Sequence, residues 1–379
     1  MTGGRIVPLT TSVPARAERL ARARKEQAER GVDALLLGPS PDLEYLTGYR
    51  PPALERLTML VLPAHGEARL VVPALEAPLA RDHLGGLEVE VAAWPETADP
   101  VRLVTGALAA AGAAGGRLGV GDRLWSGFLL RLQDALAGAG FTVASTVTRQ
   151  LRMRKDPEEV EALARAAAAI DRVVEHLGEL RWAGRSEQAL TRDIEQAIRD
   201  THDTCCFAIV ASGPNAASPH HVATGRVIAP GDPVVVDIGG RLDGYCSDTT
   251  RTLVVGEPPA GFLELYTLLH AAQLAGCAAV RPGVAAAGVD AACRDPITAA
   301  GHGALFLHRT GHGIGLEEHE DPYIVAGNEE PLEPGMAFSI EPGLYPQGRY
   351  GARIEDIVVC TQDGGRRLNT TPRDLRIVS

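Results

Sequence analysis

The sequence predicts a two-domain protein of mixed helix and strand, with a smaller α/β domain at the N-terminus and a larger α+β domain after it. Three observations carry this prediction. The chain has 379 residues, which is enough for two or three domains of ordinary size. Short apolar runs alternate with helical patterns over residues 1–150, and a helix-start signal follows Gln150. Strands cluster again near the C-terminus, so we assign the domains to residues 1–150 and 151–379.

The N-terminal domain is predicted to alternate strands with helices, as α/β domains do. We expect strands at Val32–Leu37, Thr58–Leu62, Ala68–Val72 and Arg117–Val120. We expect helices at Ala15–Arg30, Pro73–Asp82, Asp99–Ala111 and Leu124–Ala137. Three glycines stand where a helix would end, at Gly31, Gly112 and Gly138.

The C-terminal domain begins with a long amphipathic helix. Asp156 suits the N-cap, Pro157 the first turn and Glu159 the third position, because the first amides of a helix need an acceptor. Apolar residues then recur every three or four positions as far as Leu177. Further helices are expected at Ser186–Arg199, Phe262–Val280 and Ala285–Ala300. Strands are expected at Phe207–Ala211, Pro233–Ile238, Thr250–Val255, Ala337–Glu341, Ile354–Val359 and Leu375–Val378.

Charge and composition narrow the classes of partner. The 37 basic and 48 acidic residues give a net charge of −11, which disfavours nucleic acid and anionic membranes. No run approaches the roughly 18 apolar residues that span a bilayer. Met1–Pro14 lacks the apolar core of a secretory signal, and the six cysteines lack zinc-site spacing. We therefore expect a cytoplasmic protein with reduced thiols that acts on small molecules or peptides.

Two aspartates lie on either side of a predicted chain reversal. Asp237 ends an apolar run, and Asp248 comes eleven residues later, after Gly239, Gly240 and Gly244. A hairpin with those glycines in its reversal would bring the two carboxylates together. Either aspartate alone would be read as a turn former.

Three histidines lie in the glycine-rich run HRTGHGIGLEEHED, at His308, His312 and His319. Glycine lets the backbone approach a ligand closely, and imidazole is a common metal ligand. A hydrogen-bonded loop cluster with no ligand is the alternative. The nearby acids Glu317, Glu318, Glu320 and Asp321 are expected on the solvated surface.

Two more carboxylates, Glu341 and Glu355, stand in strands that otherwise look like core. A buried acid costs several kcal/mol unless it is paired or binds a metal. Because side chains alternate along a strand, Arg353 and Glu355 share one face. Asp356 is expected to face solvent.

Together these residues form a plausible set of metal ligands. The carboxylates of Asp237, Asp248, Glu341 and Glu355 carry four negative charges, and His312 adds a neutral nitrogen. That charge would neutralise two divalent cations, whereas one would leave an excess of −2. An oxygen-rich set favours Mn²⁺, with Co²⁺, Fe²⁺ and Zn²⁺ as alternatives. Two such ions about 3.5 to 4 Å apart would hold a bridging hydroxide and polarise a carbonyl.

The order and surroundings of these residues resemble the metallopeptidase family that contains methionine aminopeptidase, aminopeptidase P and prolidase. The resemblance covers about residues 150–375 and implies a C-terminal pita-bread (creatinase/aminopeptidase-like) catalytic domain. It rests on five motifs, VVVDIGG with SDTTRT, HRTGHGIGLEEHE, SIEPGLY, GARIEDIV and SGPNAASPHH. Each ligand position of the family has the expected residue type here, at Asp237, Asp248, His312, Glu341 and Glu355.

The resemblance also implies roles for other residues. His220 and His319 occupy the positions of histidines that contact the scissile carbonyl and its tetrahedral intermediate. His220 is preferred to its neighbour His221 because it follows Pro219 directly. His308 and Tyr345 would line a pocket for proline, and Arg353 would lie near the metal centre. Glu341 would act both as metal ligand and as general base.

Several functions remain open within this resemblance. The first 150 residues look like the creatinase/prolidase N-terminal domain, which favours Xaa-Pro hydrolysis, and the compact N-terminal domain favours a dipeptidase. An aminopeptidase P acting on longer Xaa-Pro-Yaa peptides is the main alternative. A creatinase-like C–N hydrolase and a non-catalytic binding protein share the fold, but no ligand position is lost here. The family resemblance also implies that this chain forms a homodimer. The sequence has no GxSxG or HExxH motif and no Walker lysine, which disfavours other hydrolases and nucleotide enzymes.

Overall fold

The computed structural model describes residues 11–379, which form two compact units. The first comprises residues 11–152 and the second Met153–Ser379. The stretch on which the expected lack of a secretory signal rests falls largely in residues 1–10, outside the described residues. Among residues 11–379, no helix is both long enough and apolar enough to cross a bilayer.

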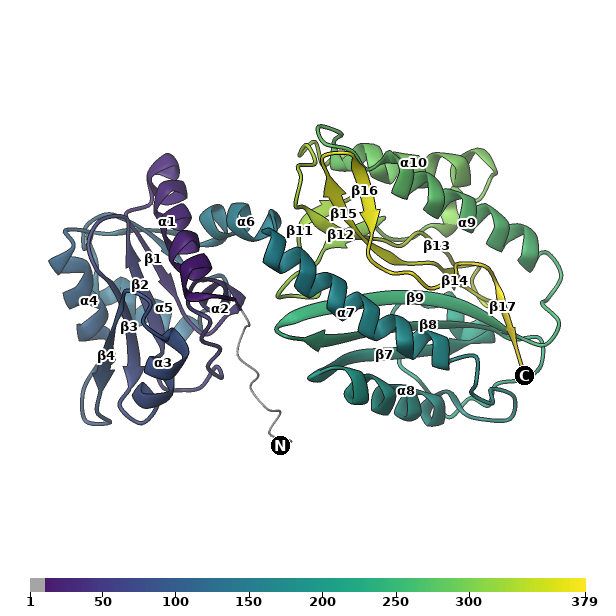
Figure 1. Cartoon of the computed structure of the whole chain (residues 1–379), viewed down its shortest axis with the longest axis horizontal. Coiled ribbons are helices and arrows are strands. Elements are labelled where there is room, and N and C mark those ends of the chain that lie inside the picture. The colour runs from purple at the N-terminus through teal and green to yellow at the C-terminus, as the bar shows by residue number, and fades with distance from the viewer. Residues whose placement is uncertain (1–10) are drawn as a thin grey trace. The chain divides into compact units, whose positions relative to one another are not determined.

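The first unit is a six-stranded mixed sheet with helices around it, in the strand order β4-β3-β2-β1-β5-β6 (Figure 1). Its strands are β1 (Ala34–Leu37), β2 (Met59–Pro63), β3 (Ala68–Pro73), β4 (Val89–Trp94), β5 (Arg117–Val120) and β6 (Gly140–Val143). Its helices are α1 (Val13–Arg30), α2 (Pro41–Thr47), α3 (Ala77–Leu84), α4 (Pro100–Ala110), α5 (Ser126–Ala135) and α6 (Ser145–Met153).

Most predicted elements of this unit are confirmed, and the differences have local causes. Helix α3 starts four residues later than predicted, because Pro73 still pairs with Trp94 in the β3–β4 ladder. Gly31 and Gly112 follow helices with positive φ, as expected, but α5 ends before Gly138. The sequence analysis missed α2, α6 and the short strands β4 and β6.

The second unit contains two helix-covered sheets. One is four-stranded in the order β17-β9-β8-β7, and the other is five-stranded in the order β11-β10-β12-β15-β16. The helices are α7 (Pro157–His176), α8 (Glu187–Thr201), α9 (Phe262–Ala279) and α10 (Ala286–Ala299), with 3₁₀ turns η1 (Gly213–Ala217) and η2 (Gly303–Leu305). The longer strands are β7 (Thr204–Ser212), β8 (Pro233–Leu242), β9 (Tyr245–Val255), β11 (Glu320–Ile324), β12 (Ala337–Ile340), β15 (Asp356–Thr361) and β16 (Gly364–Arg367). The short ones are β10 (Gly311–Gly313), β13 (Gly343–Leu344), β14 (Ala352–Arg353) and β17 (Arg376–Val378).

Each sheet of the second unit packs against its own pair of helices (Figure 1). Helices α7 and α8 bury apolar residues such as Ile170 and Ile194 on the sheet that contains Val236. Helices α9 and α10 cover the other sheet through residues such as Leu269 and Phe338. Burial of these apolar faces is the main stabilising contribution, at roughly 25 cal/mol per Å².

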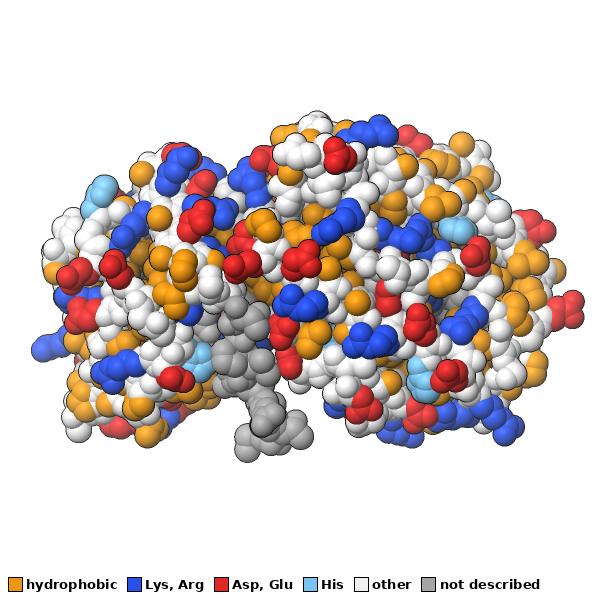
Figure 2. Space-filling model, viewed as in Figure 1, with side chains coloured by type: hydrophobic (Ala, Val, Ile, Leu, Met, Phe, Trp, Pro, Cys, Tyr) orange, Lys and Arg blue, Asp and Glu red, His pale blue; other side chains and the backbone are white. Residues whose placement is uncertain are grey.

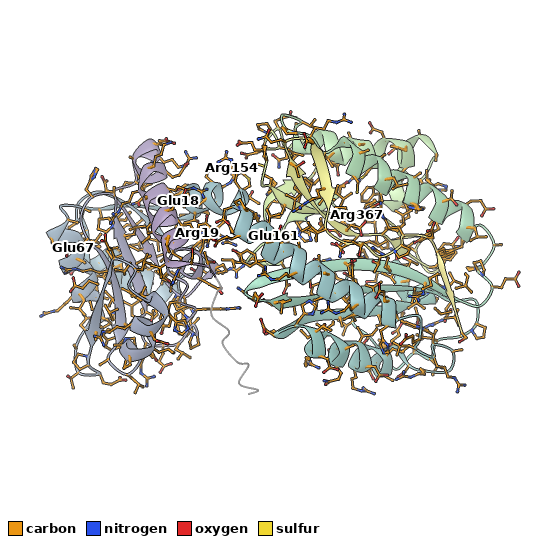
Figure 3. All side chains as sticks on the ribbon, viewed as in Figure 1. Glu18, Arg19, Glu67, Arg154, Glu161 and Arg367 are labelled. Atoms are coloured by element: carbon orange, nitrogen blue, oxygen red, sulfur yellow. The ribbon has the colours of Figure 1, made fainter. Side chains whose placement is uncertain are left out.

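The start of the second unit is tied to the five-stranded sheet by side-chain contacts. Arg154, labelled in Figure 3, donates two hydrogen bonds to Glu333, at 2.7 and 2.6 Å. Lys155 forms a 2.8 Å ion pair with Glu320, and both residues are buried. The sequence analysis expected Glu320 on the solvated surface, and this expectation is wrong. Glu320 is buried because Lys155, from a distant segment, pairs with it.

On the face shown in Figure 2, acidic and basic side chains are interspersed.

Candidate active site

Asp237 and Asp248 lie on the two strands of one hairpin, as predicted. Strands β8 and β9 pair antiparallel, with Asp237 opposite Thr250. Asp248 is two residues from Thr250, so both aspartates project from the same face of the sheet. The hairpin turns at Asp243 and Gly244, with φ of 52° and 87°. Positive φ at both turn residues matches the twist of paired strands.

The other two glycines of this region have a different function from the one expected. Gly239 and Gly240 lie inside β8 and not in the reversal. A Cβ on Gly240 would come within 2.7 Å of the His202 ring. Glycine is needed there because a buried side chain packs directly on the strand.

His312, on β10, faces two of the carboxylates. Its Nδ1 lies 3.1 Å from the carbonyl oxygen of Gly313 and donates to it, because a carbonyl only accepts. Its Nε2 lies 3.2 Å from Glu341 Oε1 and 3.7 Å from Asp248 Oδ2. A ring nitrogen that faces two carboxylates is stable only with a proton or a cation between them.

Ser339, on β12, makes hydrogen bonds to both His312 and Glu341. Its hydroxyl accepts the backbone N–H of His312 at 3.0 Å and donates to Glu341 Oε1 at 3.2 Å. A Cβ on Gly311 would collide with the backbone oxygen of Ser339, so only glycine allows the two strands to approach this closely. The sequence analysis did not single out Ser339.

Glu355 and Arg353 share one face, as strand alternation predicts, and both contact Thr250. The Thr250 hydroxyl donates to Glu355 Oε2 at 2.7 Å and accepts from Arg353 Nε at 3.1 Å. Arg353 also donates to Asp237 Oδ2 at 2.5 Å. Arg353 thus connects the segment that carries Glu355 to the β8–β9 hairpin that carries Asp237.

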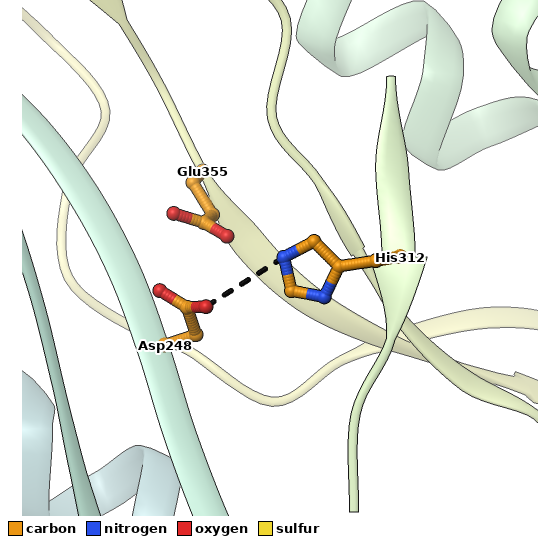
Figure 4. A group of neighbouring side chains, drawn as sticks. All are labelled: Asp248, His312 and Glu355. Carbon is orange, nitrogen blue, oxygen red and sulfur yellow. Dashed lines mark ion pairs between the residues drawn. The ribbon is translucent and has the colours of Figure 1, made fainter. Parts of the chain in front are cut away.

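The donor set fits a divalent cation. One atom each from Asp248, His312 and Glu355 lies within 4.8 Å of the others, and the three side chains converge from separate elements (Figure 4). Asp237 Oδ1 and Glu355 Oε1 are buried without a hydrogen-bond partner among the described residues. Buried carboxylate oxygens without partners are costly, so these atoms are free to bind a cation.

The electrostatics of the cluster agree with this fit. Burial, followed by the charge of Glu355, raises the pKa of Asp248 well above its ordinary value. Burial and the charge of Glu341 do the same to the pKa of Glu355. Burial also opposes ionisation of Glu341, but the hydrogen bond and charge of His312 lower its pKa to about 2. Carboxylates crowded in this way repel each other and favour a bound cation.

His308, Tyr345 and Arg353 form one hydrogen-bonded chain. Arg353 donates to the Tyr345 hydroxyl at 2.8 Å, so the tyrosine directs its own proton to His308 Nε2 at 2.9 Å. His308 Nδ1 then donates to the carbonyl of Arg309 at 2.7 Å. Burial raises the pKa of Tyr345 to about 12, which keeps the hydroxyl protonated. The two residues predicted to line a pocket thus lie next to the arginine.

The other three histidines that the sequence analysis considered occupy distinct positions. His319 is exposed and packs on His312, with ring centroids 4.0 Å apart. His221 is held by Glu187, with Nε2 2.9 Å from Oε2. His220 is exposed, and its neighbour Pro219 accepts a 3.4 Å hydrogen bond from Arg353.

Asp356 is buried and does not face solvent, contrary to the expectation from sequence. Arg251 donates to it at 2.7 Å, and Arg367, labelled in Figure 3, approaches it at 3.8 Å. The residue pattern of the strand around Asp356 could not predict these partners, because they lie elsewhere in the sequence. Glu187 and Thr250 were missed for the same reason, although Glu187 follows a recognisable N-cap, Ser186.

Two protein-family models match this chain. Residues 161–362 match the model of metallopeptidase family M24, and residues 19–154 match the creatinase/prolidase N-terminal domain. The chain belongs to metallopeptidase family M24. The resemblance stated from the motifs is therefore confirmed, and with it the pita-bread fold of the second unit.

Three relatives of this M24 metallopeptidase match it over nearly their whole length. The crystal structure of dipeptidase PepE from Mycobacterium ulcerans is 47% identical with a TM-score of 0.92, covering 97% of this chain and 99% of that one. A prolidase structure from Thermococcus sibiricus is 35% identical with a TM-score of 0.90, covering 97% and 100%. A Xaa-Pro dipeptidase from Lactobacillus helveticus is 35% identical over 351 residues, covering 89% of this chain and 92% of its own.

Proposed function

We propose that this M24 metallopeptidase is a Xaa-Pro dipeptidase that uses two divalent cations, with Mn²⁺ as the first candidate. The observation that carries the proposal is the convergence of Asp248, His312 and Glu355 beside the Asp237–Arg353 and His312–Glu341 pairs. Relatives named Xaa-Pro dipeptidase and prolidase, similar over almost the whole chain, support the substrate class.

The charge of the site supports two cations in place of one. The proposed ligands carry four carboxylates, and Arg353 offsets one of them through its contact with Asp237. Three negative charges remain, which is more than one divalent ion neutralises. When bound, a pair of such ions supplies Lewis acidity that activates water and polarises the scissile carbonyl.

The residues of the chain then orient substrate and move the proton. A bound cation would keep the carboxylate of Glu341 ionised, and Glu341, which lies beside His312 and Ser339, is proposed to accept a proton from the attacking water. His220 and His319 are proposed to donate hydrogen bonds to the carbonyl oxygen as negative charge develops on it. Donors placed in this way can lower a barrier by about 3 kcal/mol each.

The His308–Tyr345–Arg353 chain is proposed to bind the proline end of the substrate. Tyr345 presents a protonated hydroxyl fixed between His308 and Arg353. The Tyr345 ring is buried, so the partly exposed ring of His308, whose centroid lies 5.5 Å from that of Tyr345, is the one that can offer surface to a pyrrolidine ring.

A peptide panel tests the proposal. The protein, loaded with Mn²⁺, is incubated separately with Xaa-Pro dipeptides, Xaa-Pro-Yaa tripeptides and Met-Ala-Ser. Cleavage of the dipeptides, with little release from the other two, is the expected result. Preferred cleavage of the Xaa-Pro-Yaa tripeptides would instead identify an aminopeptidase P. If none of the three kinds of peptide is cleaved, the peptidase assignment is overturned. Sedimentation of the same sample checks the expected homodimer.

A further inference from the structure

Glu187 is a fully buried carboxylate that one loop surrounds with hydrogen-bond donors. It is the first residue of α8. The donors are Ser212 N and Oγ, Asn215 Nδ2, His221 Nε2, and Thr224 N and Oγ1, at distances from 2.7 to 3.2 Å. All of them lie within residues 212–224, the segment that carries His220.

This contact requires a carboxylate. An ionised glutamate only accepts hydrogen bonds, whereas a glutamine would turn an NH₂ group toward some of these donors. The N-terminus of α8 also favours a negative charge at this position. Burial opposes ionisation, but hydrogen bonds from His221, Thr224 and Ser212 outweigh it and lower the pKa of Glu187 to about 2.

The opposite side of the same loop lies against the active site. The carbonyl of Pro219 accepts from Arg353 at 3.4 Å, and that of Ala217 accepts from Gln347 at 3.1 Å. A Cβ on Gly351 would collide with the backbone oxygen of Ala216, so the loop is closely packed there. The loop is therefore held between Glu187 and the residues next to Asp237.

We propose that Glu187 is a positioning residue for His220. By binding the ring of His221 and both ends of the loop, it fixes the backbone from which His220 projects. This also explains why the two neighbouring histidines have different roles. His221 is bound by Glu187, whereas His220 is not. The inference rests on the proposed function, because it assigns Glu187 an effect on turnover through His220.

The first test compares Glu187→Gln with a matched control, Glu159→Gln. Glu159 is also a buried glutamate in the first turn of a helix, and it accepts from Tyr245 at 3.0 Å and from the Asp156 backbone, outside the loop. For Glu187→Gln we expect kcat on a Xaa-Pro dipeptide to fall about 10- to 100-fold, as for other residues that orient a catalytic group. Bound Mn²⁺ is expected to stay unchanged, and KM to change far less than kcat. Glu159→Gln should keep kcat near the wild-type value.

A double-mutant cycle with His220→Ala separates positioning from general loss of structure. If Glu187 acts through His220, adding Glu187→Gln to His220→Ala lowers kcat little further. Losses that multiply, or an unchanged kcat in folded Glu187→Gln, would overturn the proposal. If Glu187→Gln does not fold, Thr224→Val replaces it, because Thr224 is exposed and its hydroxyl makes one of the bonds to Glu187, besides accepting the exposed N–H of Arg226 at 3.2 Å. A lowered kcat there supports the proposal, and an unchanged one contradicts it.

Hydrogen exchange of residues 213–224 gives a readout that needs no substrate. We expect faster exchange of this segment in Glu187→Gln, and in Thr224→Val if that variant replaces it, but not in Glu159→Gln. If the wild-type protein cleaves no peptide, the proposed function fails, and exchange alone decides whether Glu187 holds the loop. If the wild type is active and Glu187→Gln matches it in kcat and exchange, only the positioning role fails.

Discussion

The hydroxyl of Thr250 donates to Glu355 Oε2 at 2.7 Å, while Glu355 Oε1 is buried with no hydrogen-bond partner among the described residues. One oxygen of the carboxylate is thus oriented by the protein, and the other is left without a hydrogen bond. Residues that orient a metal ligand commonly change affinity about 10- to 100-fold when they are replaced.

We therefore predict that Thr250→Val weakens Mn²⁺ binding about 10-fold. Valine keeps the shape of threonine but lacks the hydroxyl, so Glu355 Oε2 loses its donor and Arg353 Nε loses an acceptor. The fold should survive, because Arg353 keeps its contacts with Asp237 and Tyr345. Calorimetric titration of the metal-free protein measures the change. Thr267→Val on α9, where the hydroxyl bonds only the exposed helix backbone, is the control. Equal affinity in the wild type and Thr250→Val would show that Glu355 needs no such support.

Removing a carboxylate of the cluster should abolish function without unfolding the protein. Asp248→Ala and Glu355→Ala are each expected to lose hydrolysis and bound metal. Since burial and mutual repulsion raise the pKa of both acids, the metal-free variants should be at least as stable as the metal-free wild type. Metal analysis, peptide assays and thermal melts check the three parts. Full activity in either variant would refute the ligand assignment.

His319→Ala should separate metal binding from turnover. The ring packs on His312 but is exposed, so its loss leaves the ligands in place. We expect unchanged Mn²⁺ content and a fall in kcat of about 100-fold or more, as for lost donors to a developing oxyanion. Steady-state kinetics at saturating metal measures this. Unchanged kinetics would remove His319 from the proposed contact with the intermediate.

Glu187 should contribute a stability that acid removes. Its pKa falls from an ordinary 4.5 to about 2 in the folded protein. Its contribution, about 3 kcal/mol at 1.36 kcal/mol per unit, is therefore complete above pH 4.5 and lost as pH falls from 4.5 toward 2. Urea unfolding at pH 6 and pH 3 measures this. The stability difference between the wild type and Glu187→Gln should shrink at the lower pH, and a difference independent of pH would contradict the assignment.

Local patterns explain how much of the site could be predicted. Asp237 and Asp248 were recognisable because both flank one hairpin, and Glu355 because an acid in an apolar strand needs a partner. Asp356 has the same local setting, yet it was assigned to solvent because Arg251, its partner, lies 105 residues away. Glu187 was missed because its donors begin 25 residues later and form no periodic pattern.

The most direct test is a crystal of the wild-type protein soaked in Mn²⁺ and measured near the manganese absorption edge. The account predicts two anomalous peaks enclosed by the five predicted ligands, Asp237, Asp248, His312, Glu341 and Glu355. A single peak would contradict the two-cation proposal. No peak, with these side chains pointing apart, would contradict the metal centre itself.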